Sequence, residues 1–375
     1  MALIKVKTGG VDSTVNFGRR NMIINGAMQV AQRYGYNSAQ TDWNDYDASD
    51  RMFKRTSGGS TSSVQTRNDD APSGFTYSDK LTITSQNSDT YIGRGTSLEW
   101  NDISHLRAGY SDAKTITLSF WVKASISGTY CFAYTSYVAL HSSGDAATSY
   151  VTEYTVNSAN TWEYKTISIP ADTAGNIDND NGPAVSLIWW LNSGSTYSSG
   201  STQTSWSTYS AADSNAANLG VGGATSDYIA ITGVQLEVGS VATEFERRPY
   251  GTELQLCQRY YQRYGYPDSF INTSQVVWVD ATTFGYFITF DTDDGLMTHP
   301  LPVRMRATPS ASITESYISL NNQTQSFTSG NTLQLNSSTV THASFHIDTN
   351  DGITTPMFAV SFSNANGYYD LSAEL

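Results

Sequence analysis

Cysteine and long apolar runs are both scarce in this chain, and each scarcity excludes a class of protein. The 375 residues include only two cysteines, Cys131 and Cys257. Two cysteines are too few for a structural zinc site or for a disulfide-rich secreted scaffold. Cys131 lies in an apolar run and Cys257 in an expected helix, so we expect both to be buried and reduced.

No window approaches the roughly 20 consecutive apolar residues that a membrane-spanning helix needs. The first ten residues also lack the apolar core of a signal peptide. We therefore expect a protein that is made in the cytoplasm and does not insert into a membrane.

Charge is also sparse, and its balance is acidic. Charged residues make up 15% of the chain, and the formal net charge is −13. Nucleic-acid binding needs clustered Lys and Arg that displace counterions from phosphates, and an anionic membrane surface makes a similar demand. The composition therefore argues against both partners, and the acidity is typical of a soluble surface.

Short strands joined by polar loops are what the composition does favour. The chain has 29 Gly and 24 Tyr, is rich in Ser and Thr, and is still 39% hydrophobic, which is enough to form packed cores. Residues 115–123 alternate most clearly, with Ile116, Leu118, Phe120 and Val122 on one face and Trp121 on the other.

Further strands are expected over 80–84, 161–169, 185–191 and 228–238, where Gly233 suggests a bulge that changes the buried face. Loops of uneven length separate these strands, and no helical period intervenes. We therefore predict an all-β chain that begins with an antiparallel jelly-roll β-sandwich.

Four parts of the chain follow from this pattern. Residues 1–20 form a polar N-terminal arm, too short for a core of its own, which is either disordered or docked as an anchor. Residues 21–250 form the jelly-roll domain and 251–266 a connecting helix. Residues 267–375 form a second, C-terminal β-sandwich domain of ordinary size.

The expected helix begins with a capping box, with Thr252 as N-cap and Gln255 reaching back to it. At helical spacing it then carries an apolar stripe that either docks between the domains or contacts other chains of an oligomer. This stripe consists of Leu254, Cys257, Tyr261 and Tyr264.

Aromatic side chains on polar strand faces are the strongest binding candidates. Trp121 and Trp190 each lie opposite the apolar face of their strand, and Trp206, Tyr197 and Tyr209 lie in a Ser- and Gly-rich loop. Exposed rings of this kind stack on the apolar face of a sugar. The alternative is that they pack under loops or in a subunit interface.

Calcium is the one metal for which the chain offers a plausible turn. Asp178 and Asp180 provide hard oxygen ligands, and Gly182 allows a tight turn. Asx-rich turns also arise for backbone reasons alone, so a solvated loop is the alternative. We expect no other cofactor.

Catalysis has little support in the sequence. Glu99 and Asp102, beside Trp100, are the best pair for glycoside hydrolysis, which needs two carboxylates across a cleft. Acidic residues near a tryptophan are common without chemistry. No nucleophile elbow or phosphate loop is present in the sequence, so we expect a protein that is not an enzyme.

Five segments in order carry a family resemblance. They are 20–33, Ala-Ser-Asp-Arg-Met-Phe at 48–53, 118–124, 235–249 with Cys-Gln-Arg-Tyr-Tyr at 257–261, and Tyr-Tyr-Asp-Leu-Ser-Ala-Glu-Leu at 368–375. Together they resemble the tail-fibre and capsid-fibre proteins, or virion appendages, of bacteriophages. Met52 departs from the pattern, which would have an aromatic residue there.

The resemblance implies a carbohydrate-binding-module-like jelly roll, a C-terminal β domain, a homotrimer and a place in the virion, with the N-terminal arm holding other virion proteins. It brings no established binding residues. Three functions remain open, in this order: attachment to a bacterial surface glycan, a purely structural role as a capsid fibre, collar or decoration protein, and glycan depolymerisation.

Overall fold

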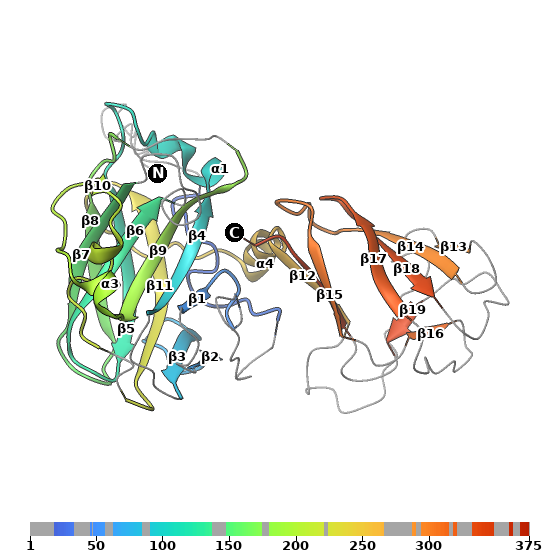
Figure 1. Ribbon diagram of the computed structural model, residues 1–375, viewed down its shortest axis with the longest axis horizontal. Coiled ribbons are helices and arrows are strands. Elements are labelled where there is room, and N and C mark those ends of the chain that lie inside the picture. The colour runs from blue at the N-terminus through green and yellow to red at the C-terminus, as the bar shows by residue number, and fades with distance from the viewer. Residues whose placement is uncertain are drawn as a thin grey trace, which may run out of the picture. The chain divides into compact units, whose positions relative to one another are not determined.

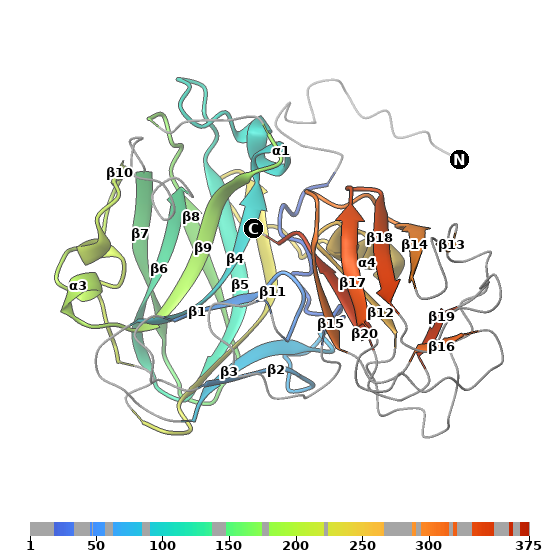
Figure 2. The same cartoon turned by 45° about the vertical axis from the view of Figure 1, so that its right-hand side comes forward.

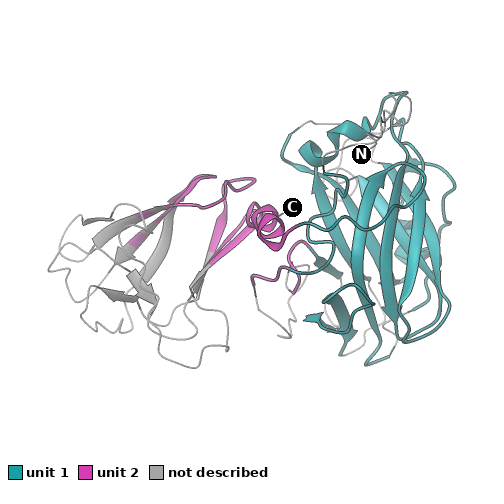
Figure 3. Ribbon diagram, turned by 180° about the vertical axis from the view of Figure 1, so that it is seen from behind, with its two compact units in different colours: residues 1–29, 39–46, 52–248 teal, residues 30–38, 47–51, 249–375 magenta. Residues whose placement is uncertain are grey.

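The chain divides into two compact units, which are coloured separately in Figure 3. Unit 1 comprises residues 1–29, 39–46 and 52–248, and unit 2 comprises 30–38, 47–51 and 249–375. The computed structural model describes residues 19–33, 46, 48–56, 63–84, 91–136, 148–174, 180–220, 224–265, 287–289, 294–314, 318–320, 332–348, 360–362 and 368–374. The predicted arm thus lies almost entirely outside the described residues.

Unit 1 is a sandwich of two antiparallel sheets (Figures 1 and 2). The six-stranded sheet has the order β1 (Phe53–Thr56), β4 (Ile92–Glu99), β9 (Pro183–Asn192), β6 (Gly128–Ser136), β7 (Thr148–Val156) and β10 (Ser207–Thr208). The five-stranded sheet has the order β2 (Ser63–Asn68), β3 (Ser78–Ile83), β11 (Tyr228–Val238), β5 (Ile116–Ala124) and β8 (Glu163–Ile169).

The chain crosses repeatedly between these sheets, for example from β3 to β4, back to β5 and across again to β6. Such alternation between two antiparallel sheets is the jelly-roll arrangement. Short helical turns join the strands: α1 (Trp100–Ile103), η1 (Ser104–Leu106), α3 (Ser195–Ser198) and η2 (Ala211–Asp213). The prediction of an all-β chain led by a jelly-roll sandwich is confirmed.

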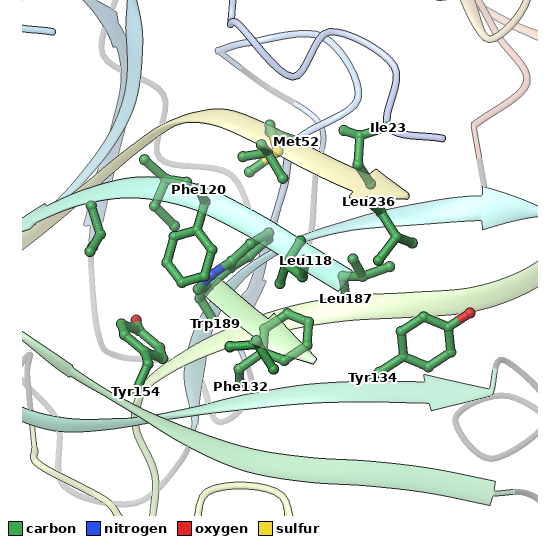
Figure 4. Close-up of a cluster of buried hydrophobic side chains, with 14 of the residues drawn as sticks. Ile23, Met52, Leu118, Phe120, Phe132, Tyr134, Tyr154, Leu187, Trp189 and Leu236 are labelled. Carbon is green, nitrogen blue, oxygen red and sulfur yellow. The ribbon is translucent and has the colours of Figure 1, made fainter. Parts of the chain in front are cut away.

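The core lies between the sheets, where alternate residues of each strand meet (Figure 4). Phe120 of β5 meets Trp189 of β9 edge-to-face at 5.4 Å between ring centroids, and Phe132 of β6 meets the same indole at 5.3 Å. Edge-to-face pairs favour a fixed ring arrangement beyond the area that they bury. The alternation predicted for residues 115–123 therefore corresponds to a real inner face.

Among the described residues of unit 1, Arg94 and Asp79 form a fully buried ion pair. Arg94 of β4 and Asp79 of β3 are both about 1% exposed or less, and the guanidinium holds both carboxylate oxygens, with Nη2 to Oδ2 at 2.6 Å. The two residues come from opposite sheets, so the pair ties the sheets together. A buried charge of this kind depends on its partner, because no water replaces it.

A bulge interrupts β11, as its sequence suggested. The pairing of β11 with β5 shifts between Thr232 and Gln235, and Gly233 has a φ of +61°. This left-handed conformation suits glycine, which has no Cβ to clash with the carbonyl oxygen. The bulge lets both Ile231 and Val234 face the core.

Unit 2 begins with α4 (Tyr250–Gln258) and continues into β12 (Tyr261–Gly265). Its described strands form three antiparallel sheets. They are β12 with β20 (Tyr368–Ser372) and β15 (Ser310–Thr314); β13 (Phe287–Thr289), β14 (Asp294–Pro300), β18 (His342–Asp348) and β17 (Thr332–Ser338); and β16 (Ile318–Leu320) with β19 (Val360–Phe362). In the part of the chain described here, no helix is long and apolar enough to cross a membrane.

The prediction of one helix over 251–266 was wrong at both ends. The helix begins at Tyr250, with Pro249 rather than Thr252 as N-cap and no side-chain cap, and it ends at Gln258. Tyr261 and Tyr264 lie instead in β12, which pairs residue by residue with β20. Hydrogen bonding to a strand more than 100 residues away decides the conformation here, although the local spacing of apolar residues favours a helix. Tertiary pairing commonly has this effect.

A buried cluster joins distant parts of the chain within unit 2. Glu374 accepts hydrogen bonds from Arg33, at 3.0 Å, and from Arg51. The two guanidinium groups also lie over aromatic rings, Arg33 at 3.7 Å from the Tyr261 centroid and Arg51 at 3.5 Å from that of Tyr260. We call Arg33, Arg51 and Glu374 the terminal clamp. Four of the five segments that carry the resemblance contribute to it or to its rings.

The clamp explains why 30–38 and 47–51, which lie within the predicted 21–250 domain, cluster with unit 2. Their arginines, Arg33 and Arg51, pair with Glu374, and all three residues belong to unit 2. Glu374 and Asp50 hold the pKa of the Arg33 guanidinium above its ordinary value, although burial alone would lower it. Burial raises the pKa of the Asp50 carboxyl, and Arg33 only partly offsets this effect.

Candidate functional site

A row of aromatic rings crosses the outer face of the five-stranded sheet of unit 1. Trp121 of β5 lies beside Tyr164 of β8, with 5.5 Å between ring centroids, and Phe75 lies edge-on to Phe245 at 5.1 Å. A Cβ added to Gly233 would lie 2.7 Å from Phe75 Cζ and 3.1 Å from Trp121 Cδ1, so the two pairs meet over the bulge. We call Phe245, Phe75, Trp121 and Tyr164 the aromatic row.

The aromatic row is accessible at one end. Tyr164 is 44% exposed and lies on β8, an edge strand of its sheet, while the other three rings are half-buried. The absence of a side chain at Gly233 leaves space for Phe75 and Trp121 to approach each other. The row therefore presents ring surface at the end nearest β8.

Polar groups border the row at the C-terminal end of β5. Asp70 accepts hydrogen bonds from Lys123 Nζ at 2.7 Å and from Trp162 Nε1 at 3.0 Å. The Tyr228 hydroxyl donates to Asn160 Oδ1 at 2.6 Å. Partial burial would raise the pKa of Asp70, but the bonds from Lys123 and Trp162 hold it below its ordinary value. Asp70 is thus fixed as a charged acceptor beside the rings.

The turn between β7 and β8 positions these groups through Glu163. Its carboxylate accepts from Lys165 Nζ at 2.6 Å, from the Asn157 amide and side chain at 3.1 and 2.8 Å, and from the Ser158 amide at 2.7 Å. These bonds close the turn that carries Asn160 and leads to Trp162 and Tyr164. Slight burial opposes ionisation, but the four donors lower the pKa of Glu163 to about 2.

We expect the turn to stay closed at pH 4 and to open only as the pH falls through about 2. Because the pKa of Glu163 is lower in the folded state than in an unfolded chain, where it is about 4.3, the stabilisation is complete above that value and is lost as protonation proceeds. Amide chemical shifts of Asn157 and Ser158 as a function of pH measure this. A midpoint near 4.3, or the same midpoint in Glu163→Gln, contradicts the assignment.

Trp190 does not offer an exposed surface, contrary to prediction. It does lie on the outer face of the six-stranded sheet, opposite Trp189, but it is only 4% exposed. Tyr197 of α3 stacks on it at 5.9 Å, and Tyr91 meets it edge-on at 5.5 Å. The segment after β9 folds back over this face, so the ring packs under a loop.

The proposed loop site of Trp206, Tyr197 and Tyr209 is not assembled in the structure. Tyr197 belongs to the Trp190 cluster, where burial and the neighbouring Tyr91 and Tyr209 raise its pKa. Trp206 packs instead against Tyr134 of the main core at 5.2 Å and donates its indole N–H to the Pro170 carbonyl at 2.7 Å. Trp206 therefore packs against the main core, and Tyr197 packs against the Trp190 cluster.

The calcium prediction is only partly covered, because Asp178 lies outside the described residues. Asp180 Oδ1 accepts from the Gly182 amide at 2.7 Å, which is the backbone arrangement of an Asx turn. Among the residues described, no group of three or more His, Cys, Asp or Glu is placed to hold a metal ion.

The other predicted positions have structural contacts. Glu99 is buried at the end of β4, and Asp102 of α1 forms an ion pair with Arg19 at 2.9 Å. Cys257 and Tyr261 are buried within unit 2, so they do not present a surface to another chain, while Leu254 is half-buried. The side chain of Tyr264 lies outside the described residues.

Burial raises the pKa of the Cys131 thiol to about 11, as expected for an inert buried thiol.

Sequence reasoning found Trp121 but missed the other rings of the row. Tyr164 shares the outward face of β8 with Thr166 and Ser168, all exposed, so the alternation along 163–169 could have identified it. Phe75 and Phe245 lie outside strands, and only the fold brings them to Gly233.

Comparison with known proteins gives structural similarities only. No family model matches the chain, and neither does any curated protein. Part of the chain is similar to the enzymatically active domain of tailspike protein 4 of bacteriophage CBA120, with 11% identity and a TM-score of 0.32. That match covers 58% of this chain and 21% of the tailspike chain.

Two carbohydrate-binding modules are also similar. The family 11 module of a cellulosomal cellulase from Clostridium thermocellum has 14% identity and a TM-score of 0.28, covering 55% of this chain and 98% of the module. The xylan-binding module of a Paenibacillus barcinonensis protein has 10% identity and a TM-score of 0.24, covering 57% and 100%. Similarity at this level says nothing about what this chain binds.

Proposed function

We propose that unit 1 binds a bacterial surface polysaccharide through the aromatic row, and that the chain is an attachment protein of a bacteriophage fibre. The observation that carries the glycan proposal is the line of rings from Phe245 to Tyr164, at centroid spacings of 5.1 and 5.5 Å within its pairs. Sugar rings stack their apolar faces on aromatic rings. A sugar can stack on the row at Tyr164, its exposed end.

The polar border supplies the second half of such a site. Sugar hydroxyls need both donors and acceptors, and Asp70, Lys123, Trp162 and the Tyr228–Asn160 pair are held by hydrogen bonds beside the rings. Fixed polar groups beside an aromatic surface favour a ligand that is bound by stacking and hydrogen bonds. We propose that the chain has no enzymatic activity.

The phage assignment rests on the five segments described above. It includes a homotrimer, a position in the virion, and attachment to other virion proteins through residues 1–20. Three copies of a weak site raise the effective concentration of the second and third contacts, which suits binding to a repetitive polysaccharide. Light scattering that finds a stable monomer contradicts this part of the proposal.

A purely structural virion component is the second candidate, and the terminal clamp favours it. Most segments that carry the resemblance meet in this buried cluster, where they serve folding rather than recognition. A structural component predicts no glycan binding at any avidity.

Tyr164→Ala is expected to weaken binding to host-surface polysaccharide at least about fivefold, because it removes a stacking ring worth about 1 kcal/mol. Titration calorimetry of the native protein and the variant measures this, with circular dichroism as a check on folding. Tyr250→Ala is the matched control, since Tyr250 is 56% exposed and lies in unit 2. Equal affinities of native protein and Tyr164→Ala contradict the site, and absence of binding by the native protein favours the structural role.

A further inference from the structure

A second candidate site lies at the opposite end of unit 1 from the polar border. A pocket with a volume of ≈ 30 Å³ opens there, and its walls include the rings of Trp100, Tyr134 and Trp206. Ile116, the first residue of β5, also lines it, whereas Trp121 of the aromatic row lies five residues further along the strand. At about 3.3 Å per residue, the two sites are roughly 17 Å apart.

The pocket is apolar in its depth, with a carboxylate in its wall. Ile103 and Leu106 are buried and line it together with the aromatic rings. Asp172 also lines it, and its Oδ2 accepts from the Thr148 hydroxyl at 3.1 Å while Oδ1 accepts from the Ala174 amide at 3.1 Å. These bonds fix the carboxylate in place. A carboxylate accepts about four hydrogen bonds, so it can also receive a donor from a ligand.

The loop between η1 and β5 contributes Ala108 and Lys114 to the lining of the pocket. The Gly109 amide donates to the Asp172 carbonyl at 2.8 Å, which holds the loop between η1 and β5 against this edge. Tyr110 in that loop is 52% exposed, with Arg107 at 4.6 Å from its ring centroid. Lys114 lines the pocket and is half-buried. Its ammonium group can donate to a carbonyl or a hydroxyl.

Size and chemistry together select the ligand. A cavity that holds one water needs about 10–15 Å³, so this pocket takes a substituent of a few atoms but not a whole sugar ring. The apolar walls favour a methyl group, and Asp172 favours an adjacent N–H donor. An acetamido group has both, whereas a hydroxymethyl group lacks the methyl and the methyl of a 6-deoxy sugar lacks the N–H.

We propose that this pocket binds the acetamido group of an N-acetylated amino sugar, with the pyranose ring at the mouth. The methyl enters among Trp100, Tyr134 and Trp206, the N–H donates to Asp172, and Lys114 donates to the carbonyl oxygen. The site is separate from the aromatic row and does not depend on it. A glycan that contains amino sugars would thus contact unit 1 at two places.

Saturation-transfer difference NMR tests this with the methyl glycosides of N-acetylglucosamine and N-acetylgalactosamine, and with methyl glucoside as the comparison sugar. For at least one N-acetylated probe, we expect the strongest transfer at the acetamido methyl. Ala108→Leu fills the pocket from its wall and should abolish that transfer. Ala113→Leu, in the same loop but outside the pocket lining, should leave it intact.

Thr148→Val is the second variant, in case Ala108→Leu does not fold. It removes the hydroxyl that fixes Asp172 and should lower the transfer several-fold. Tyr164→Ala, which tests the aromatic row, should leave it unchanged. The proposal is overturned if the native protein gives no acetamido transfer, if transfer survives in folded Ala108→Leu, if it is undiminished in folded Thr148→Val, or if Tyr164→Ala abolishes it.

Discussion

Replacing Asp79 by alanine is expected to lower the free energy of unfolding of unit 1 by about 3–5 kcal/mol. The reason is that Arg94 remains in the core, at most 1% exposed, with no carboxylate to balance its charge. Urea denaturation followed by near-ultraviolet circular dichroism measures the change, because the core tryptophan Trp189 reports on the packing of this unit.

The double replacement Asp79→Leu with Arg94→Met removes both charges. Comparing it with Asp79→Ala separates the cost of one unpaired buried charge from the net contribution of the ion pair to stability. Exchange of a buried pair for apolar residues of similar size is often close to neutral, so the double variant should be much more stable than Asp79→Ala. Asp112→Ala is the surface control, since the Arg107–Asp112 pair is about half exposed and should matter far less. If Asp79→Ala costs less than about 1 kcal/mol, the pair does not tie the two sheets together.

Glu374→Ala is expected to destabilise unit 2 by about 3 kcal/mol or more, because it removes the carboxylate that two buried guanidinium groups share. Arg33 and Arg51 are 8% and 2% exposed, so water cannot solvate them in place of the carboxylate. Hydrogen exchange of the Ala373 amide, which donates to the Tyr260 carbonyl at 2.8 Å, measures the loss directly.

Glu374→Gln is the graded control for the clamp. The amide oxygen still accepts hydrogen bonds but carries no charge, so protection should fall to an intermediate value. If the Ala373 amide is equally protected from exchange in the native protein, Glu374→Ala and Glu374→Gln, the clamp does not hold the end of the chain. Core amides of unit 1 should be unaffected in every case, since the clamp lies within unit 2.

The strands that sequence could predict are those with several apolar residues in an alternating or continuous run. Residues 115–123 correspond to β5, and 228–238 match β11 together with its bulge at Gly233. β4 was not foreseen, because its sequence offers only two large apolar residues, Ile92 and Leu98, although all eight of its residues are buried. A Cβ at Gly95 would lie 2.5 Å from Phe53 Cζ, so this strand is covered on its outer side too.

The sequence could predict a residue of the candidate site only where its position on a strand is enough to decide whether its side chain is exposed. Trp121 and Trp190 have the same signature in sequence, each on the face opposite an apolar stripe. They differ in the structure because the 192–218 segment returns over Trp190 and buries it, whereas Trp121 stays half-buried beside Phe75. Long-range packing sets this difference, just as the pairing of β12 with β20 turned an expected helical stripe into a strand.

Indole N–H resonances during a titration with host-surface polysaccharide test the central claim most directly. We expect the signals of Trp121 and Trp162, assigned by substitution, to shift as ligand is added, because one lies in the aromatic row and the other beside it. The signals of Trp189 and Trp190, both at most 4% exposed, should stay in place as internal references. Saturating binding that leaves Trp121 and Trp162 unmoved would contradict the account.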